Sequence, residues 1–570
     1  MAFLLQSLFS YLYTGGRREK LRAERSSITL ASTLVIALLL GSVAVGISSM
    51  KTSAALLSSS DNSGYEFNIG GTSTTTTTTT PQTTTTTEPT GASTTTATTS
   101  RGPIFINHNE NFIPANGVTG GSGTASDPYI IEGWVISAST AHGIWILNTT
   151  DHFIVRNCTV EDGGSTHHGI YLSNVTNGRV EGNTCRNNKY GIYVYYSSGN
   201  TLTNNTCSNN AYYGIFLSSS NNNNLANNTC SNNYYGIYLN SSSNYNNLTN
   251  NTCENNSDMG IGLYSSYYNT LTGNTCQNNS WHGIYLESSS NNNTLAGNNC
   301  SNNTYGILLT SSNNSNNLAG NACSNNTYGI YLYSASNYNT LTNNTCQNNA
   351  YDGIILYSSS SNTLTNNNCS NSDLGILLTS SSNYNTLTNN TCQNNGEGIF
   401  LMNSSNYNAL TGNDSENNND GICLYSSSYN NLANNNTCGN IMDGIHMEFS
   451  PSNTLTGNTC ENNFSTGIGL HSSPSNTLTG NTCSNNICGI VLSSSPGNTL
   501  TLNYLLNNTA GNAYGDNTNY WDKDGKGNYW SDWQSPDSNG DGIVDQPRSI
   551  MEGSNVDHYP LVIPIKTPAP

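Results

Sequence analysis

The chain has 570 residues, of which 34% are hydrophobic and only 8% are Asp, Glu, Lys or Arg. An ordinary soluble domain carries roughly 25% charged residues, so the polarity here comes mainly from Asn, Ser and Thr. This composition excludes a coiled coil, a charged disordered tail and an ordinary helical enzyme. The net charge is -18, and no Lys or Arg occurs from Tyr190 to Asp522. A nucleic-acid partner is not expected, because phosphate binding needs a basic surface.

The amino-terminal segment has the pattern of a membrane anchor. Five basic residues between Arg17 and Arg25 precede an uncharged, mostly apolar stretch from Ile28 to Ile47. About 20 such residues cross a bilayer core, with the basic flank in the cytoplasm. A retained transmembrane helix over residues 28–50 is favoured, and cleavage as a long signal peptide is the alternative. The partner of this segment would be the membrane, and the rest of the chain would lie outside the cytoplasm.

A Thr-rich segment follows this span. Residues 72–100 are almost all Thr, with Pro81 and Pro89, and cannot build a core. We expect an extended stalk that is O-glycosylated, and a plain disordered linker is the other interpretation. Asn-x-Ser/Thr sequons recur in the remaining chain and make N-glycosylation a further expectation.

The rest of the sequence is repetitive. Between residues 143 and 490 the dipeptide Gly-Ile occurs sixteen times, with steps of 22 to 24 residues apart from one of 26, beginning at residues 143, 169, 191, 214, 236, 260, 283, 306, 329, 353, 375, 398, 421, 444, 467 and 489. Short alternating pieces between Asn and Gly turns predict strands. One such unit is too small to bury its own apolar face, so the units must stack. The repeat therefore predicts a parallel β-solenoid of about 16 coils, since the helical side of a leucine-rich repeat is not visible.

The repeating positions predict the interior of the solenoid. In one unit, Leu202, Cys207, Ile215 and Leu217 should point inward and stack on their equivalents. Asn205 should form a hydrogen-bonded ladder at a turn, as should Asn210.

Cysteine forms a second repeating marker. It recurs at residues 185, 207, 230, 253, 276, 300, 323, 346, 369, 392, 438, 460 and 483, and Ser415 interrupts this row. Equivalent residues on adjacent coils would be about 4.8 Å apart, too far for the Cβ atoms of a disulfide, so we expect buried thiols. Cys158 would start the row one coil earlier, and Cys423 and Cys488 lie outside it.

These repeats carry a family resemblance. The Gly-Ile-x-Leu and Asn-x-Leu-x-x-Asn-x-Cys coils, the segment 121–133 and the ending 527–532 resemble NosD-type right-handed parallel β-helix proteins, a branch of the carbohydrate-binding and sugar-hydrolase β-helix group. The resemblance spans about residues 102 to 563. It implies an all-β right-handed parallel β-helix outside the cytoplasm and a polysaccharide or cell-envelope glycan as partner. The NosD name implies a periplasmic, copper-linked role.

An aromatic row supports the carbohydrate interpretation. The residue after Ile should point outward, and in half of the coils it is aromatic: Trp145, Tyr171, Tyr193, Phe216, Tyr238, Tyr285, Tyr331 and Phe400. Stacked on one face, these rings could contact sugars. The alternative is that they only pack against one another.

A row of acids is the second candidate site. Glu397, Asp420 and Asp443 each precede a Gly of the Gly-Ile series and are 23 residues apart. Stacked carboxylates repel unless they are screened or bind a cation. They could serve a glycoside hydrolase or hold Ca²⁺, and solvated acids at a turn are the third interpretation. Copper is disfavoured, because His446 and His471 lie at different offsets on neighbouring coils.

The carboxyl-terminal segment departs from the repeat. Asp537, Asn539, Asp541 and Asp545 match the first nine positions of a calcium loop, but position twelve is Arg548. A calcium site and a polar cluster of Asx turns both fit this pattern. The nearby aromatic residues Trp521, Tyr529, Trp530 and Trp533 are expected to cover the last coil.

The sequence thus predicts six segments: a cytoplasmic basic segment (1–27), an anchor or signal (28–50), a stalk (51–101), an amino-terminal cap (102–140), the β-helix (141–505) and a carboxyl-terminal cap (506–570). The leading functional hypothesis is a non-catalytic cell-surface protein, anchored or secreted, that binds carbohydrate or contributes to the envelope. A glycan hydrolase that uses the acid row is the alternative.

Overall fold

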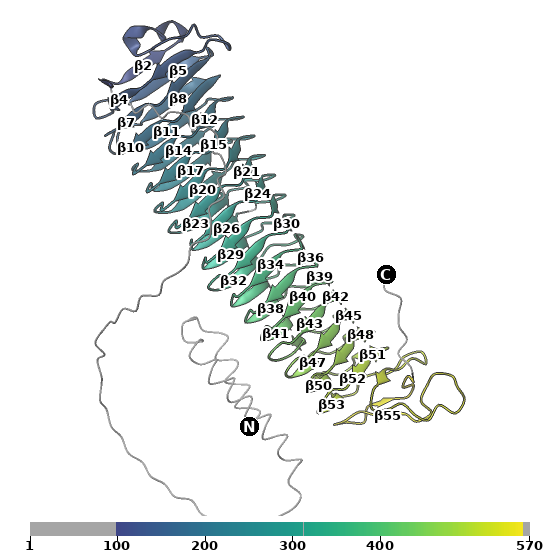
Figure 1. Ribbon diagram of the computed structural model, residues 1–570. Coiled ribbons are helices and arrows are strands. Elements are labelled where there is room, and N and C mark those ends of the chain that lie inside the picture. Colours follow the sequence, from purple (N-terminus) through teal and green to yellow (C-terminus); the bar gives the residue numbers. More distant parts are fainter. Residues whose placement is uncertain (1–98, 312, 563–570) are drawn as a thin grey trace, which may run out of the picture. The chain divides into compact units, whose positions relative to one another are not determined.

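The computed structural model describes residues 99–311 and 313–562. This part of the chain is a right-handed parallel β-solenoid of about 17 turns (Figure 1). It has no α-helix, only the short 3₁₀-helices η1 (Asn109–Asn111) and η2 (Pro114–Asn116). Among these residues no helix has the length and apolarity to span a bilayer. The predicted anchor and nearly all of the predicted stalk lie outside the described residues.

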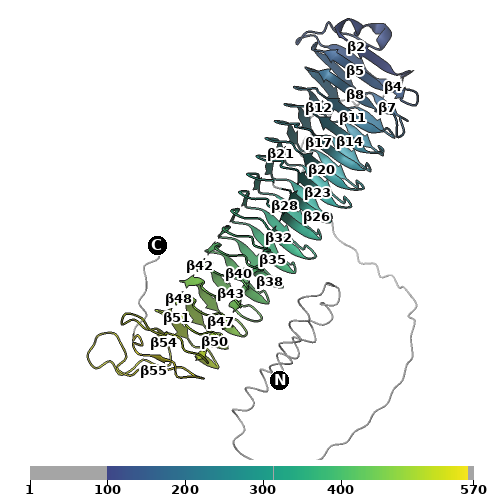
Figure 2. The same cartoon turned by 180° about the vertical axis from the view of Figure 1, so that it is seen from behind.

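Three parallel sheets run along the solenoid, and each coil except those at the ends contributes one strand to each sheet (Figure 2). Sheet A runs from β1 (Thr99–Arg101) to β54 (Tyr529–Trp530), and sheet C runs from β3 (Tyr129–Glu132) to β51 (Thr499–Thr501). Strand β1 pairs with β4 (Trp134–Ser137), so stacking begins within the expected stalk and cap segments.

Sheet B has the longest strands and carries the Gly-Ile dipeptides. Its strands are β2 (Ile104–Asn107), β5 (Ile144–Thr149), β8 (Ile170–Val175), β11 (Tyr190–Tyr195), β14 (Tyr213–Ser218), β17 (Tyr235–Asn240), β20 (Met259–Tyr264), β23 (His282–Glu287), β26 (Tyr305–Thr310), β29 (Tyr328–Tyr333), β32 (Asp352–Tyr357), β35 (Leu374–Thr379), β38 (Glu397–Met402), β41 (Asp420–Tyr425), β44 (Ile445–Glu448), β47 (Thr466–His471), β50 (Cys488–Ser493) and β53 (Gly511–Gly515).

The core consists of identical side chains stacked from coil to coil. The predicted inward residues Leu202, Cys207, Ile215 and Leu217 are all 0% exposed. Each pairs in register with its equivalent, as Leu202 does with Leu225 and Cys207 with Cys230. The alternation of the sequence therefore predicted the core correctly, because the side-chain period of a strand is two.

Buried Asn residues form ladders at the turns, as predicted. Oδ1 of Asn228 accepts hydrogen bonds from the backbone N–H and from Nδ2 of Asn205. Nδ2 of Asn228 in turn donates to the carbonyl of Leu202 and to Oδ1 of Asn251. Asn210 belongs to a second ladder of the same kind. These contacts satisfy backbone groups that the turns would otherwise leave buried and unpaired.

The cysteines are free thiols, and two assignments within their row were wrong. Val160, not Cys158, is the register partner of Cys185, so the cysteine row begins at Cys185. Further along, Ser415 pairs with Thr437, which pairs with Cys460, so Thr437 occupies the inward position. Cys438 follows Thr437, points to the other face and is only partly buried.

Aromatic residues close the last coil, as predicted. Trp521 and Trp530 are 1% and 0% exposed, and both belong to the core. Asp557 is buried beside them, and its Oδ2 accepts hydrogen bonds from the backbone N–H of Asn528 and from Nε1 of Trp530, both at 2.8 Å. Despite these bonds, burial raises the pKa of Asp557 from 3.8 to about 6.

We expect this carboxyl to make the protein less stable as the pH rises from 4 to 6.5. Between the two pKa values the unfolded chain has lost the proton of Asp557 while the folded chain still holds it, so stability falls by about 3 kcal/mol in total once the pH has passed the folded pKa. Urea unfolding at several pH values should show a shallower loss in Asp557→Asn than in the natural chain. Equal slopes in the two proteins would contradict this assignment.

Candidate functional site

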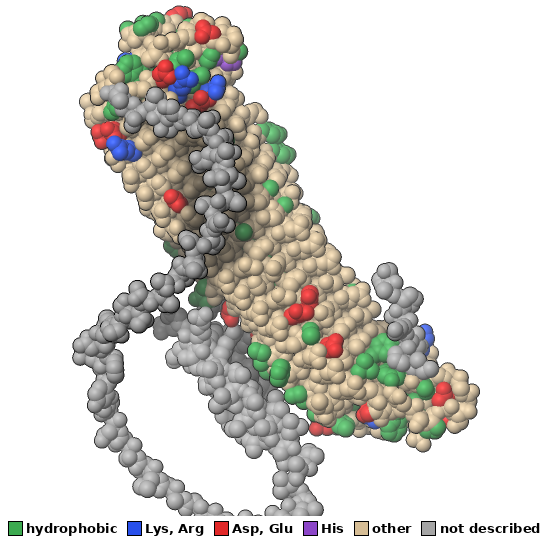
Figure 3. Space-filling view, viewed as in Figure 1, with side chains coloured by type: hydrophobic (Ala, Val, Ile, Leu, Met, Phe, Trp, Pro, Cys, Tyr) green, Lys and Arg blue, Asp and Glu red, His purple; other side chains and the backbone are tan. Residues whose placement is uncertain are grey.

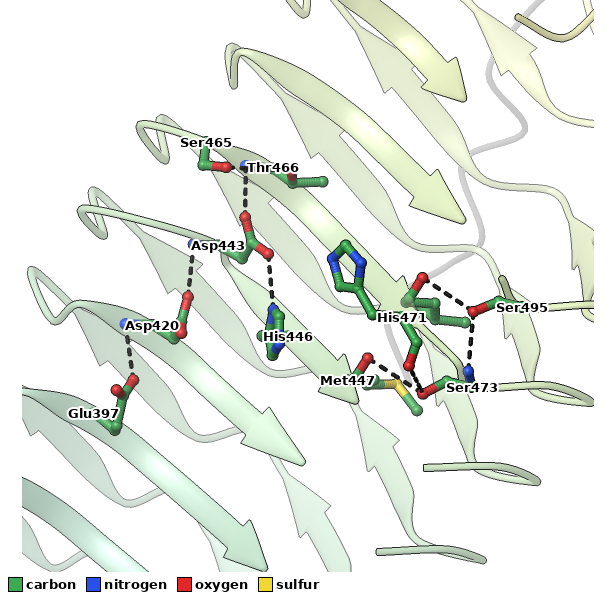
Figure 4. A network of polar contacts seen from close by, with 11 residues as sticks. Glu397, Asp420, Asp443, His446, Met447, Ser465, Thr466, His471, Ser473 and Ser495 are labelled. Atoms are coloured by element: carbon green, nitrogen blue, oxygen red, sulfur yellow. Dashed lines mark hydrogen bonds and ion pairs between the residues drawn. The ribbon is translucent and has the colours of Figure 1, made fainter. Parts of the chain in front are cut away.

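Three carboxylates form a row on sheet B (Figure 4). Glu397 begins β38 and is the register partner of Asp420, which begins β41, while Asp443 lies just before β44. Glu397 accepts a hydrogen bond from the backbone N–H of Asp420 (3.1 Å), and Asp420 accepts one from that of Asp443 (2.8 Å). Asp443 accepts a hydrogen bond from the backbone N–H of Thr466 (2.9 Å). Each acid thus binds the backbone of the next coil.

The half-buried Asp420 and the buried Asp443 differ in their electrostatic surroundings. Burial, and then the charge of Asp443, raises the pKa of Asp420 to about 6. Burial also opposes the charged form of Asp443, but a hydrogen bond from His446 and the charge of that ring leave the pKa of Asp443 below its ordinary value. At neutral pH the row therefore contains an ionised Asp443 that is balanced by a cationic partner.

That partner, His446, sits beside a second histidine. Nδ1 of His446 lies 3.1 Å from Oδ2 of Asp443. Burial lowers the basicity of His446, yet Asp443 and Asp420 together raise its pKa to about 9. The rings of His446 and His471 have centroids 5.2 Å apart. One ligand atom from each of Asp443, His446 and His471 lies within 4.8 Å of the others.

The sequence argument that separated these two histidines was wrong. His446 follows Ile445 by one position, and His471 follows Ile468 by three. Positions one and three point to the same face, because the side-chain period is two, and register places His471 beside Glu448 on the neighbouring strand. The parity of the two offsets would have revealed the cluster. Copper itself is untested by this placement.

The predicted aromatic residues form a column on the outer face of sheet B. Ring centroids are 5.7 Å apart for Trp145 and Tyr171, 4.8 Å for Tyr171 and Tyr193, and 5.0 Å for Tyr193 and Phe216, and these rings are nearly parallel. Phe216 is followed by Tyr238 at 5.9 Å. The rings cover one another's faces, so a ligand would meet mainly their edges and hydroxyl groups.

The column ends after Tyr238, because the register partner on the next coil is Gly262. Tyr285 follows Gly262 in register and stacks on His282 at 4.5 Å instead. The predicted row is therefore divided, and its longest continuous part spans the coils from Trp145 to Tyr238.

A second aromatic column was missed by the sequence analysis. Tyr384, Tyr407 and Tyr429 stack at 5.1 Å intervals in the turns after sheet B. They are 61%, 47% and 56% exposed. Tyr recurs one residue before the ladder Asn of these turns, and this spacing is the signal that could have revealed the column.

In the carboxyl-terminal loop, most of the acidic side chains accept hydrogen bonds from backbone N–H groups of the loop itself. Asp537 accepts hydrogen bonds from the N–H groups of Gly540 and Gly542, and Oδ2 of Asp545 accepts one from Ser538. Asn539 accepts one from the N–H of Asp541. This is the predicted Asx-turn arrangement. Calcium binding by these side chains stays a prediction.

Arg548, at position twelve of the calcium pattern, turns away from the loop. It pairs with Asp532 at 2.8 Å and lies over the rings of Trp530 and Trp533. Its contacts therefore belong to the cap.

Comparisons with known proteins give family matches along the solenoid. The model of the periplasmic copper-binding protein (NosD) matches residues 264–397 and 383–535, and that of the right handed beta helix region matches 100–206 and 168–323. A search of curated proteins found no match.

Among solved structures, the A-module of Azotobacter vinelandii mannuronan C-5 epimerase AlgE6 is 14% identical, with a TM-score of 0.37 over 57% of this chain and 88% of that one. The periplasmic alginate epimerase AlgG is 12% identical, with a TM-score of 0.25 over 74% and 84%. The alginate lyase AlyF-OU02 is 13% identical, with a TM-score of 0.28 over 59% and 79%. The NosD model thus matches residues 264–535, slightly less than half of the chain, and the right handed beta helix model matches the coils before them, so the solenoid is similar to both families.

Proposed function

We propose that the chain is an extracytoplasmic glycan-binding protein whose binding surface is the aromatic column from Trp145 to Tyr238. The column itself is the observation that carries the proposal. It joins five rings on consecutive coils, and because neighbouring strands are about 4.8 Å apart, it extends about 19 Å along the solenoid. An extended polymer matches such a linear surface better than a small molecule does.

The chemistry of the surroundings supports a neutral, hydroxyl-rich ligand. On the face shown in Figure 3, charged side chains gather near the amino-terminal end of the solenoid and are sparse along the middle coils. Aromatic edges with phenolic hydroxyls, flanked by Ser side chains such as Ser173 and Ser218, offer both apolar contact and hydrogen bonds. A sugar polymer presents the same two kinds of surface.

The proposed extracytoplasmic location is supported by the matching family model and by the amino-terminal pattern. The matching family model is described as periplasmic. The apolar segment 28–50 and the Thr-rich segment would carry the solenoid out of the cytoplasm, either as a membrane anchor with a stalk or as a cleaved leader. The solenoid would then meet cell-envelope or extracellular glycans.

Binding of the full chain to a panel of neutral and acidic polysaccharides, measured by affinity electrophoresis, tests this function. Tyr171→Ala with Tyr193→Ala should weaken binding at least about 10-fold, since each variant removes a ring edge and a phenolic hydroxyl, and one such hydrogen bond alone is worth about 1 kcal/mol. Tyr193→Phe keeps the ring, so it should weaken binding less than the double variant does. Tyr338→Ala, at a side chain that is 66% exposed, is the matched control. Loss of binding in Tyr407→Ala but not in the Tyr171 and Tyr193 variant would overturn the assignment.

The same samples test the second candidate, a glycoside hydrolase. It is favoured by one observation, the pairing of Asp420, whose pKa is about 6, with the ionised Asp443. If the natural chain shortens a bound glycan and the triple variant Glu397→Gln, Asp420→Asn and Asp443→Asn does not, the binding-only function is contradicted. A glycan that stays intact after long incubation with the natural chain would support the binding-only function.

A further inference from the structure

We infer that Asp443, His446 and His471 bind a divalent first-row transition-metal ion on the outer face of sheet B. The site goes beyond glycan binding, since it lies on β44 and β47, far along the solenoid from the aromatic column on β5 to β17. One carboxylate oxygen and two imidazole nitrogens suit Zn²⁺ or Cu²⁺, whereas Ca²⁺ prefers oxygen ligands alone.

The three ligands already lie close together. Oδ2 of Asp443 and Nδ1 of His446 are 3.1 Å apart, and all three ligand atoms fall within 4.8 Å of one another. Around a tetrahedral ion with bonds of about 2.1 Å, ligand atoms are about 3.4 Å apart. The side chains would therefore have to close by little more than about 1 Å. Figure 4 shows the three side chains converging from neighbouring coils.

A glycine leaves room for the ion. A Cβ atom at Gly469 would lie 2.7 Å from Oδ2 of Asp443 and 3.5 Å from Nε2 of His471. The space between these two ligands exists because this outward position lacks a side chain. Other coils place a larger residue there, including Val491 on the next strand, which is the register partner of Gly469.

A backbone hydrogen bond from the next coil also holds the carboxylate in place. Oδ1 of Asp443 accepts the backbone N–H of Thr466 at 2.9 Å, which leaves Oδ2 directed to the histidines. An imidazole nitrogen must be unprotonated to become a ligand, so the ion and a proton compete for this position.

Isothermal titration of the full chain with Zn²⁺, and electron paramagnetic resonance with Cu²⁺, test the site. One equivalent of Zn²⁺ should bind, and the Cu²⁺ spectrum should show coupling to imidazole nitrogen. His446→Ala and His471→Ala should each weaken binding by more than about 100-fold, because losing a group that only orients a ligand already costs about 10- to 100-fold. Gly469→Val keeps all three ligands but fills the space, so it should also weaken binding by at least about 10-fold.

His282→Ala is the matched control. His282 also lies on the outer face of sheet B beside an acid, with Nδ1 3.5 Å from Asp258, but it does not belong to the three-ligand group. Its loss should leave the tight equivalent unchanged. Circular dichroism and the melting temperature without metal will show whether each variant is folded.

Three results would overturn the site. Binding that persists in His446→Ala and His471→Ala would exclude these ligands. Binding that falls equally in His282→Ala would indicate nonspecific histidine contacts. Binding that survives the histidine variants and disappears after alkylation of thiols such as Cys488 would assign the metal to cysteine.

Discussion

Replacing Gly306 by Ala should destabilise the solenoid by about 2–4 kcal/mol, the upper part of the range for an overpacked interior. Gly306 is one of the Gly-Ile glycines. A Cβ atom there would lie 2.5 Å from the carbonyl oxygen of Gly329 and 3.0 Å from Cβ of Cys323. The first of these atoms is backbone and cannot rotate away, so strands β26 and β29 would have to separate.

Urea unfolding followed by circular dichroism measures this loss. Gly120→Ala is the control, because a Cβ atom at that position meets nothing within 4 Å. Its effect should stay within about 0.5 kcal/mol. Hydrogen exchange should show the loss of protection centred on the coils around residue 306, since each coil of a solenoid contacts only its neighbours. Equal stability of Gly306→Ala and the natural chain would contradict the steric role of the Gly-Ile series.

The sequence predicted the fold because one local rule repeats in every coil. Alternation placed Ile215 and Leu217 inside, and the chemistry of Asn placed Asn205 and Asn210 in ladders. A single unit shows these rules weakly. Repetition makes them visible, since the same residue types must satisfy the same neighbours about every 4.8 Å.

The prediction failed where the length of a coil changes. Cys438 looked like a member of the thiol row, but Asn435 holds the ladder position, with bonds to Asn413 and Asn458. The inward residue comes two positions after the ladder Asn, and there it is Thr437. A slip of one residue exchanges the two faces of a strand. Counting from Leu432, which precedes Asn435 by three as Leu202 precedes Asn205, would have given the correct register.

The candidate site could be predicted only in part. Equal spacing located Glu397, Asp420 and Asp443, but spacing alone does not show that each carboxylate accepts a backbone N–H from the next coil. The metal cluster also depends on Gly469, and a missing side chain leaves no signal in a search for ligand residues. Both features arise from contacts between coils, which a linear pattern does not contain.

Replacing Asn321 by Ala should cost about 3–5 kcal/mol, because it leaves several buried polar groups without partners at about 1–3 kcal/mol each. Oδ1 of Asn321 accepts the N–H and Nδ2 of Asn298, and its own Nδ2 donates to the carbonyl of Leu295 and to Oδ1 of Asn344. Asn321 is 0% exposed, so water cannot replace these bonds without opening the coil.

Two variants of the same coil show whether the cost comes from the ladder. Asn317→Ala removes an exposed amide and should change the free energy of unfolding by less than about 0.5 kcal/mol. Asn321→Asp keeps an acceptor oxygen for Asn298 but loses both donors and buries a charge, so it should be at least as unstable as Asn321→Ala at neutral pH and recover when the carboxyl is protonated in acid. Urea unfolding at pH 7 and pH 4 measures both. If Asn321→Ala lowered the free energy of unfolding as little as Asn317→Ala, the Asn ladder would not stabilise the turn. The low charge of the chain would then need another cause than the stacking of neutral amides.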